Sequence, residues 1–531
     1  MASLSVESMN RGESSTLQGR TFTAIDTHLG SPSRIIRKLH RKSIRNIVVN
    51  ISKSISYMND TYHPLFMTLT PDGYMPRLVE KDVSASLRAF GAVCIVGPKY
   101  CGKTWVGLNA SESAFMMGGV NRYGVSNRDL ADADIRIALD GEPPHMIDEW
   151  QEIPRIWDAV RSEVDAGTSK GRFVLTGSST PVRKGSAPVH SGTGRIRRLR
   201  MCTMSLLESG DSTGSISLRA IMDGEDIGIV HGGVTLERLA ELVVRGGWPG
   251  NLSLPPEDCA VAVGGYLDSI VEDACGLDDV RRKESSFRMV LRSLARNECT
   301  LASMSRIQAD TGVPVDAPSV PDREEDAERR ALSINTVTDY IDVLDRLFLL
   351  EDQPAFDPNL KSSVRVGKTA KRHLADPSLA VALLGAGKER LTEDLPTMER
   401  MFESLCERDL QIYARAIGAR LFHYRDEKGM EADAIVETED GRWGAFEIRL
   451  GANKADEAAS NLLEFRDAME RRGARSLPSA LCVICGTAAV GYRRGDGVYV
   501  VPITSLGPRP SQQHGHVDRD VRHASVSDPS S

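Results

Sequence analysis

A short apolar segment that runs directly into a glycine-rich turn constrains the fold of this chain more than any other feature. The apolar residues are 92–96, and the turn reads Gly97-Pro98-Lys99-Tyr100-Cys101-Gly102-Lys103-Thr104. The turn meets every fixed position of the pattern G-x-x-x-x-G-K-[ST], and the residues after it have helical character. A strand, a glycine turn and a helix in this order predict a parallel α/β sheet.

The residue types in this turn suit phosphate binding. Glycines allow the backbone to curl so that its N–H groups converge, and the N-terminus of the following helix adds partial positive charge. Lys103 can reach the β- and γ-phosphates of a nucleotide, and the Thr104 hydroxyl can bind magnesium. We therefore predict that residues 97–104 bind ATP together with Mg²⁺.

Hydrolysis needs further groups, and an acidic pair after a second apolar segment supplies candidates. Asp148 and Glu149 directly follow Met146-Ile147. At the end of a strand, Asp148 would hold magnesium through water, and Glu149 would orient or deprotonate the attacking water. Acidic pairs are common on protein surfaces, and the position at a strand end is what favours a catalytic role.

Two further segments offer groups for the γ-phosphate. The apolar run at 173–175 is followed by hydroxyl residues, of which Thr176 or Ser178 could sense that phosphate. The alternative, that these residues form a loop that only turns the chain, is equally open. Residues 194–200 carry four arginines, and Arg195 is our choice for an arginine finger. Arg197 and Arg198 could instead contact nucleic acid, a neighbouring subunit or only solvent.

Composition and charge are those of an ordinary polar protein. Hydrophobic residues make up 41% and charged residues 26% of the 531 residues, and this length suggests about three or four domains. The formal net charge of −7 means that DNA or RNA would need a local basic patch. The sequence has no apolar run long enough for a membrane span and no secretory signal, which predicts a cytoplasmic protein without a membrane partner.

The two ends of the chain and the cysteines each allow a functional and a purely structural interpretation. Residues 1–57 are Ser-rich and basic, so they could be a nucleic-acid-binding arm, a targeting peptide, or translated DNA upstream of a start at Met58 or Met67. We expect a disordered leader over residues 1–73 and a disordered tail over residues 508–531. Cys482 and Cys485 lack a second ligand pair for zinc, and we expect them to be buried in a strand.

Between these ends the pattern of apolar residues predicts several modules. Alternating helices and strands continue to about residue 199, and residues 206–275 are more helical. Helices are expected at 287–297, 301–309 and 334–350, and a last α/β region follows from about residue 391. The helix at 334–350 is acidic, so it is not expected to read DNA, and partner docking or core packing suits it better.

The motifs together resemble those of bacterial and archaeal AAA+-superfamily ATPases in which a P-loop domain precedes a C-terminal domain of unknown function. The matching stretches include "GPKYCGKT", "MIDEWQEIPRIWDAVR", "FVLTGSSTP", "GGWPGNL", "YIDVLDRLFLLEDQPAF" and "HYRDEKGMEADAIVE". The resemblance implies a P-loop ATPase domain at 74–205, a helical lid at 206–275 and a winged-helix-like module at 276–390. It also implies that residues 391–507 form a domain similar to PD-(D/E)xK nucleases.

Acidic residues in the last domain give the nuclease-like interpretation a chemical basis. Glu403 lies on an expected helix, and Asp433 and Glu447 lie on successive expected strands, where two acids could bind magnesium beside a phosphate. Arg449 stands where such nucleases have lysine. Arginine can clamp a phosphate but cannot readily lose a proton. A fold that binds nucleic acid or a partner is therefore favoured over an active nuclease.

These predictions combine into one leading hypothesis and two alternatives. The leading one is a Mg²⁺-dependent ATPase that acts as a switch for the C-terminal nuclease-like domain. The first alternative is a nucleotide-gated module with negligible turnover that binds nucleic acid, a protein partner or a second copy of itself. The second is an active metal-dependent nuclease.

Overall fold

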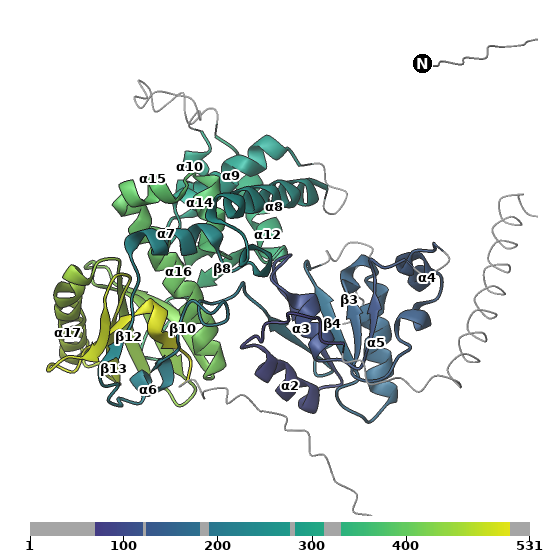
Figure 1. The fold of residues 1–531 in the computed structure, drawn as a ribbon, viewed down its shortest axis with the longest axis horizontal. Coiled ribbons are helices and arrows are strands. Elements are labelled where there is room, and N and C mark those ends of the chain that lie inside the picture. The colour runs from purple at the N-terminus through teal and green to yellow at the C-terminus, as the bar shows by residue number, and fades with distance from the viewer. Residues whose placement is uncertain (1–68, 121–123, 181–190, 277–281, 313–330, 510–531) are drawn as a thin grey trace, which may run out of the picture. The chain divides into compact units, whose positions relative to one another are not determined.

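The computed structural model describes residues 69–120, 124–180, 191–276, 282–312 and 331–509. Predictions for residues 1–68 and 510–531 lie outside this part of the chain. The first sheet is fully parallel, with the strand order β2-β3-β4-β1-β5. Its strands are β1 (Ala92–Val96), β2 (Ser113–Met116), β3 (His145–Asp148), β4 (Phe173–Gly177) and β5 (Ile196–Arg200). The predicted α/β class is confirmed (Figure 1).

Helices cover both faces of this sheet, which explains why its interior strand β1 is apolar throughout. Val93 and Ile95 of β1 belong to the core on the side of α2 and α3, and Cys94 belongs to the core on the side of α5. The alternation follows from the period of two in a strand. The helices of this domain are α2 (Glu80–Ala89), α3 (Lys103–Asn109), α4 (Asn127–Ala133), α5 (Arg155–Ala166), and the 3₁₀ turns η1 (Ile135–Ala138) and η2 (Trp150–Glu152).

A mostly helical module follows in the chain. The Thr235 side chain caps its first helix by accepting a hydrogen bond from the backbone N–H of Arg238. The three helices expected between residues 287 and 350 are present, and two short antiparallel strands follow the third. The winged-helix interpretation stays a prediction. The elements are α7 (Leu236–Arg245), η3 (Pro249–Asn251), α8 (Pro256–Gly276), α9 (Glu284–Arg296), α10 (Met304–Asp310), α12 (Ile334–Arg346), β8 (Leu350–Gln353), α13 (Val364–Gly367), β9 (Lys371–Leu374), α14 (Pro377–Leu383), α15 (Lys388–Glu393) and α16 (Leu395–Ala416).

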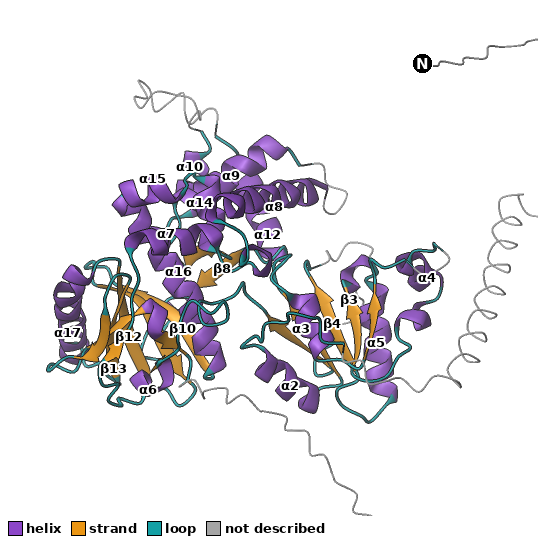
Figure 2. Cartoon of the chain, viewed as in Figure 1, coloured by secondary structure: helices purple, strands orange, loops and turns teal. Residues whose placement is uncertain are grey.

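The last domain contains a mixed sheet, in which Figure 2 labels β10, β12 and β13. Its strand order is β10-β11-β12-β13-β15-β14-β7. Helices α16 and α17 pack against it, and α17 belongs to the hydrophobic core on one face. Cys482 and Cys485 are buried in β13 and face different cores, so they do not form a zinc pair. The elements are β10 (Ala419–Arg425), β11 (Glu431–Thr438), β12 (Trp443–Arg449), η5 (Ala452–Lys454), α17 (Ala455–Arg471), β13 (Ala480–Cys485), β14 (Val490–Arg493), β15 (Tyr499–Pro502), η6 (Ile503–Ser505) and β16 (Leu506–Gly507).

The segment after the first domain differs from the expected helical lid. It contains β6 (Ile216–Ser217), α6 (Leu218–Met222) and β7 (Val230–His231) before α7 begins. Strand β6 pairs with β16, and β7 pairs with β14 at the edge of the mixed sheet. Residues of this segment therefore complete the last domain. Sequence patterns missed this because two-residue strands are too short to show a period. Within the described residues, no helix has the length and apolar character needed to cross a membrane.

Candidate nucleotide-binding site

The predicted phosphate loop lies between β1 and α3, at the carboxyl edge of the parallel sheet. Gly102 has a φ of 101°, in the left-handed region that favours glycine. A Cβ atom at Gly97 would lie only 2.2 Å from the carbonyl oxygen of Met201. Glycine is therefore required at both fixed positions, one for backbone conformation and one for close packing.

The two polar residues that end the loop point to different partners. Lys103 is buried, and its Nζ donates a hydrogen bond of 2.7 Å to the carbonyl oxygen of Pro98. The Thr104 hydroxyl donates to Asp148 Oδ1 at 3.0 Å. A hydroxyl and a carboxylate are oxygen ligands of the kind that Mg²⁺ takes in nucleotide sites. The donor set therefore fits a magnesium ion held between Thr104 and Asp148.

Thr176 holds the acidic pair in place from the neighbouring strand β4. Its hydroxyl donates to Asp148 Oδ1 and accepts a 3.1 Å hydrogen bond from the backbone N–H of Glu149. Burial raises the pKa of the Asp148 carboxyl, and the hydrogen bonds from Thr176 and Thr104 oppose that shift. Thr176 is fully buried, so it positions the acids, whereas Ser178 is the β4-end hydroxyl that lines the cavity.

Glu149 projects into the same space as the phosphate loop and is held by two polar neighbours. Ser178 Oγ donates to Glu149 Oε2 at 2.9 Å, and Gln151 Nε2 donates to the same oxygen at short range. Glu149 has a φ of 51°, an uncommon backbone conformation for a residue other than glycine. Such conformations concentrate at functional sites.

These groups open onto a cavity of about 970 Å³. This volume is at the upper end of the range for small-ligand pockets. Polar phosphate-loop and acidic side chains share the cavity with apolar residues suited to a nucleobase. Its lining includes Tyr74, Met75, Lys99, Tyr100, Gly102, Lys103, Thr104, Trp105, Arg128, Glu149, Ser178, Met204, Pro249 and Gly250.

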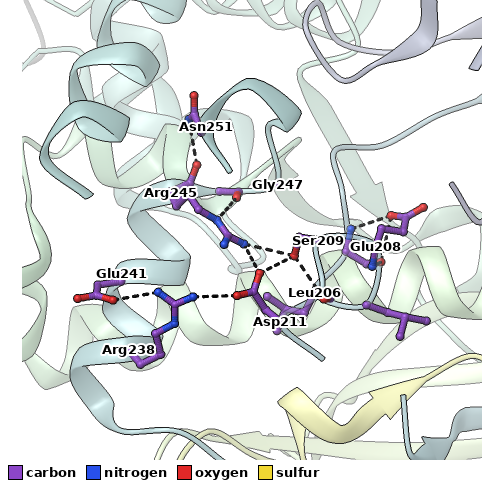
Figure 3. A network of polar contacts seen from close by, with 12 residues as sticks. Leu206, Glu208, Ser209, Asp211, Arg238, Glu241, Arg245, Gly247 and Asn251 are labelled. Atoms are coloured by element: carbon purple, nitrogen blue, oxygen red, sulfur yellow. Dashed lines mark hydrogen bonds and ion pairs between the residues drawn. The ribbon is translucent and has the colours of Figure 1, made fainter. Parts of the chain in front are cut away.

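A network of polar contacts fixes the turn that carries Pro249 and Gly250 (Figure 3). Arg245 at the end of α7 forms an ion pair of 2.6 Å with Asp211, and Arg238 binds the same carboxylate at 2.9 Å. Asn251 Nδ2 then donates to the carbonyl oxygen of Arg245 at 3.1 Å. The segment after β5 and the turn after α7 are thereby held together at the wall of the cavity.

Arg77 supports the loop from outside the motif, and sequence reasoning missed it. Its Nη1 donates to the Cys101 carbonyl oxygen at 2.7 Å, and its Nη2 donates to that of Cys202 at 3.0 Å. Its Nε forms an ion pair of 3.1 Å with Glu208, and both side chains are buried. Arg77 therefore joins the loop to the end of β5. The only available signal was the position of Arg77 in the stretch YMPRLVEK, residues 74–81, shortly before the strand that leads into the loop.

Arg195 lies at the other edge of the sheet from the phosphate loop. It directly precedes β5, whose first residue Ile196 pairs with Ala92 at the start of β1. The length of β1 thus separates Arg195 from the loop, about 13 Å at roughly 3.3 Å per residue. Its guanidinium pairs with Asp165 at 2.7 Å. Within one chain the fold does not bring Arg195 to the cavity, so a finger role remains a prediction that requires a second subunit.

The predicted acids of the last domain do come together. Arg449 binds Asp433 at 3.1 Å and Glu447 at shorter range, and the backbone N–H of Ile448 donates to Asp433 at 2.8 Å. Burial and the charge of Asp433 raise the pKa of Glu447 to about 9. The Arg449 guanidinium therefore lies between the two carboxylates that were expected to share a metal ion.

Glu403 lies beside this group and is paired with a lysine that the sequence did not single out. Lys371 of β9 is buried and binds Glu403 at short range and Glu407 at 2.7 Å, both on α16. Burial raises the pKa of Glu403 to about 8, with a further contribution from Asp433. No regular spacing links residue 371 to the acids, so only the fold could place it there.

Comparison with known proteins finds three matched regions along the chain. Residues 89–209 match the AAA domain family, residues 236–390 match a domain of unknown function (DUF8612), and residues 398–506 match a domain of unknown function (DUF4143). Uncharacterized proteins of Mycobacterium tuberculosis and Mycobacterium bovis are each 24% identical over 383 residues. The match covers 70% of this chain and 74% of each relative.

Two solved structures show weaker similarity. A Walker-type ATPase of Pyrococcus abyssi is 12% identical with a TM-score of 0.35, and the match covers 60% of this chain and 99% of that one. The RuvB Holliday junction branch migration motor of Thermotoga maritima is 16% identical with a TM-score of 0.23, covering 54% and 94%.

The fold, the loop and the matched domain define a P-loop nucleotide-binding protein of the AAA class. The chain carries an AAA domain that is followed by a C-terminal domain of unknown function, DUF4143. The resemblance drawn from the motifs is thereby confirmed, while the nuclease-like part of it stays a prediction.

Proposed function

We propose that the protein binds ATP with magnesium at residues 97–104 and hydrolyses it. The observation that supports this most is the 3.0 Å contact between Thr104 and Asp148, beside a Glu149 carboxylate that faces the same cavity. Lys103 would hold the β- and γ-phosphates, and Thr104 and Asp148 would hold Mg²⁺, which neutralises charge on the transferred phosphoryl group. Glu149 would accept a proton from the attacking water.

Substitutions at Lys103 and Glu149 separate binding from hydrolysis. Lys103→Ala is expected to abolish ATP binding. Glu149→Gln is expected to retain bound ATP while turnover falls by about 10²–10⁴-fold, the usual contribution of a general base. Glu163→Gln on α5, an exposed acid outside the cavity, serves as the matched control. Turnover at the control rate in the Glu149→Gln protein would show that Glu149 does not activate water.

A nucleotide-gated module with negligible turnover is the second candidate. It is favoured by the two hydrogen-bond donors that hold the Glu149 carboxylate, Ser178 and Gln151. Phosphate release measured with and without added DNA, RNA or candidate proteins separates the two functions. Fewer than one ATP hydrolysed per protein molecule under every condition, with tight ATP binding, would establish the gated module.

We further propose that the C-terminal domain is the output of the nucleotide site and binds nucleic acid or a protein partner without cutting. The backbone N–H of Leu206, just after β5, donates to Asp409 of α16 at 2.9 Å, and α16 also carries Glu403. Arg449 lies between Asp433 and Glu447, which disfavours a metal ion there. Plasmid DNA is expected to stay intact with Mg²⁺ or Mn²⁺. Cleavage that is lost in Asp433→Ala would contradict this proposal.

A further inference from the structure

Lys99, at a variable position of the phosphate loop, has a side chain in the same cavity as the catalytic groups. It lines that cavity together with Lys103, Thr104 and Glu149. Burial alone would lower the pKa of its ammonium, but Asp273 and, more weakly, Glu149 outweigh this effect and raise the pKa. Lys99 is therefore a charged group close to the carboxylate that faces the γ-phosphate position.

The ammonium of Lys99 is paired with a residue of the helical module. Its Nζ lies 2.6 Å from Asp273 Oδ2 on α8, and the two side chains are 40% and 42% exposed. Exposed ion pairs of this kind are weak because water screens them. A triphosphate carries more negative charge than one carboxylate, so it can compete for the lysine.

A second contact joins the loop to the same face of α8. The Tyr100 ring packs edge-on against the Tyr266 ring, with centroids 5.8 Å apart. Tyr266 and Asp273 are separated by two helical turns, so both face the loop. Tyr100 has a φ of 63°, a conformation that costs energy for a residue with a side chain. The contacts with α8 thus hold the loop in a conformation it would not favour alone.

The contact on α8 continues into the rest of the module. Tyr266 packs on Trp248 at 4.7 Å, and the Trp248 indole N–H donates to Ser378 at 2.9 Å. Ser378 donates to Asp376, which forms an ion pair of 3.0 Å with Arg408 of α16. A change at the loop therefore has a continuous path of packed and hydrogen-bonded groups to α16.

We propose that Lys99 contacts the γ-phosphate of bound ATP and that Asp273 is the positioning residue that holds it in the absence of nucleotide. This inference rests on the proposed nucleotide site. Exchange of Lys99 from Asp273 to phosphate supplies a cation from the same chain, which Arg195 cannot do. When Lys99 leaves Asp273, the end of α8 loses its ion pair with the loop. The helical module therefore responds to the presence of the γ-phosphate.

The test compares ATP and ADP binding, turnover and hydrogen exchange in full-length variants. Lys99→Ala is expected to lower turnover at least tenfold and to reduce the preference for ATP over ADP, while ADP affinity changes less than about threefold. Asp273→Asn is expected to tighten ATP binding by about threefold. The matched control is Asp268→Asn, because Asp268 is an exposed acid on the same helix that pairs with Arg288.

Hydrogen exchange gives a readout that does not depend on hydrolysis. ATP is expected to increase exchange at the end of α8 in the unmodified protein, and Lys99→Ala is expected to abolish that increase. The proposal would be overturned if Lys99→Ala kept the ATP preference and the ATP-induced hydrogen exchange of the unmodified protein. It would also be overturned if Asp273→Asn and Asp268→Asn bound ATP equally well. If the unmodified protein bound neither ATP nor ADP, the proposed nucleotide site itself would be refuted.

Discussion

The guanidinium of Arg77 donates a 2.7 Å hydrogen bond to the carbonyl oxygen of Cys101, so a residue before α2 fixes the shape of the phosphate loop. Its buried ion pair with Glu208 anchors the guanidinium at its other side. The loop's conformation therefore depends on two other parts of the chain, the segment before α2 and the segment after β5, and not only on its own glycines.

Replacing Arg77 is expected to cost both stability and nucleotide affinity. Arg77→Ala leaves the Glu208 carboxylate buried without its partner, which typically costs about 3–5 kcal/mol. Urea unfolding and titration with a fluorescent ATP analogue measure the two effects. The double variant Arg77→Met with Glu208→Gln is expected to recover stability but not affinity, because the donor to the Cys101 carbonyl stays absent. Recovery of both would show that Arg77 has no role in shaping the loop.

Thr176 is expected to act through the acids it holds. Thr176→Val keeps the shape but removes the hydrogen bonds to Asp148 and to the Glu149 backbone. The expected result is a higher Mg²⁺ requirement and turnover reduced by about tenfold, which corresponds to roughly 1.4 kcal/mol. Thr176→Ser should restore both. An unchanged Mg²⁺ dependence of ATPase activity in Thr176→Val would contradict this positioning role.

The free energy of unfolding is expected to fall as the pH rises between the ordinary pKa of Glu447, 4.5, and its folded-state pKa of about 9. The folded state therefore keeps a proton that the unfolded state loses between these values. Each such group lowers stability by up to about 1.4 kcal/mol per pH unit. Glu447→Gln should flatten the pH profile of unfolding between pH 5 and 9. An equally steep profile would show that Glu447 is ionised in the folded protein.

Arg449 is expected to exclude divalent cations from the C-terminal acids. In Arg449→Ala the carboxyl groups of Asp433 and Glu447 lose the guanidinium between them, and a divalent cation can take its place and displace the proton from Glu447. Millimolar Mn²⁺ is expected to raise the thermal unfolding temperature of this variant and not that of the unmodified protein. Arg442→Ala, at a partly exposed arginine of the same domain, serves as control. Equal responses of all three proteins would refute this role.

The sequence alone determined the local parts of the nucleotide site. Residues 97–104 and the Asp148-Glu149 pair each follow an apolar strand in the sequence, and the structure brings them together because the carboxyl ends of parallel strands meet at one edge of a sheet. The continuous apolar character of β1 and the helical spacing of apolar residues in α9 and α12 likewise depend only on neighbours in the chain.

The distant residues that complete each site are brought there by the path of the folded chain. Arg77, Lys371 and Asp273 each act across long separations in sequence, where no period relates one position to the other. Strand β7 joins the last sheet for the same reason, because its pairing with β14 depends on the path of the chain and not on its two residues. Arg195 shows the converse: its residue type suits a finger, but the direction of β5 places it at the far edge of the sheet.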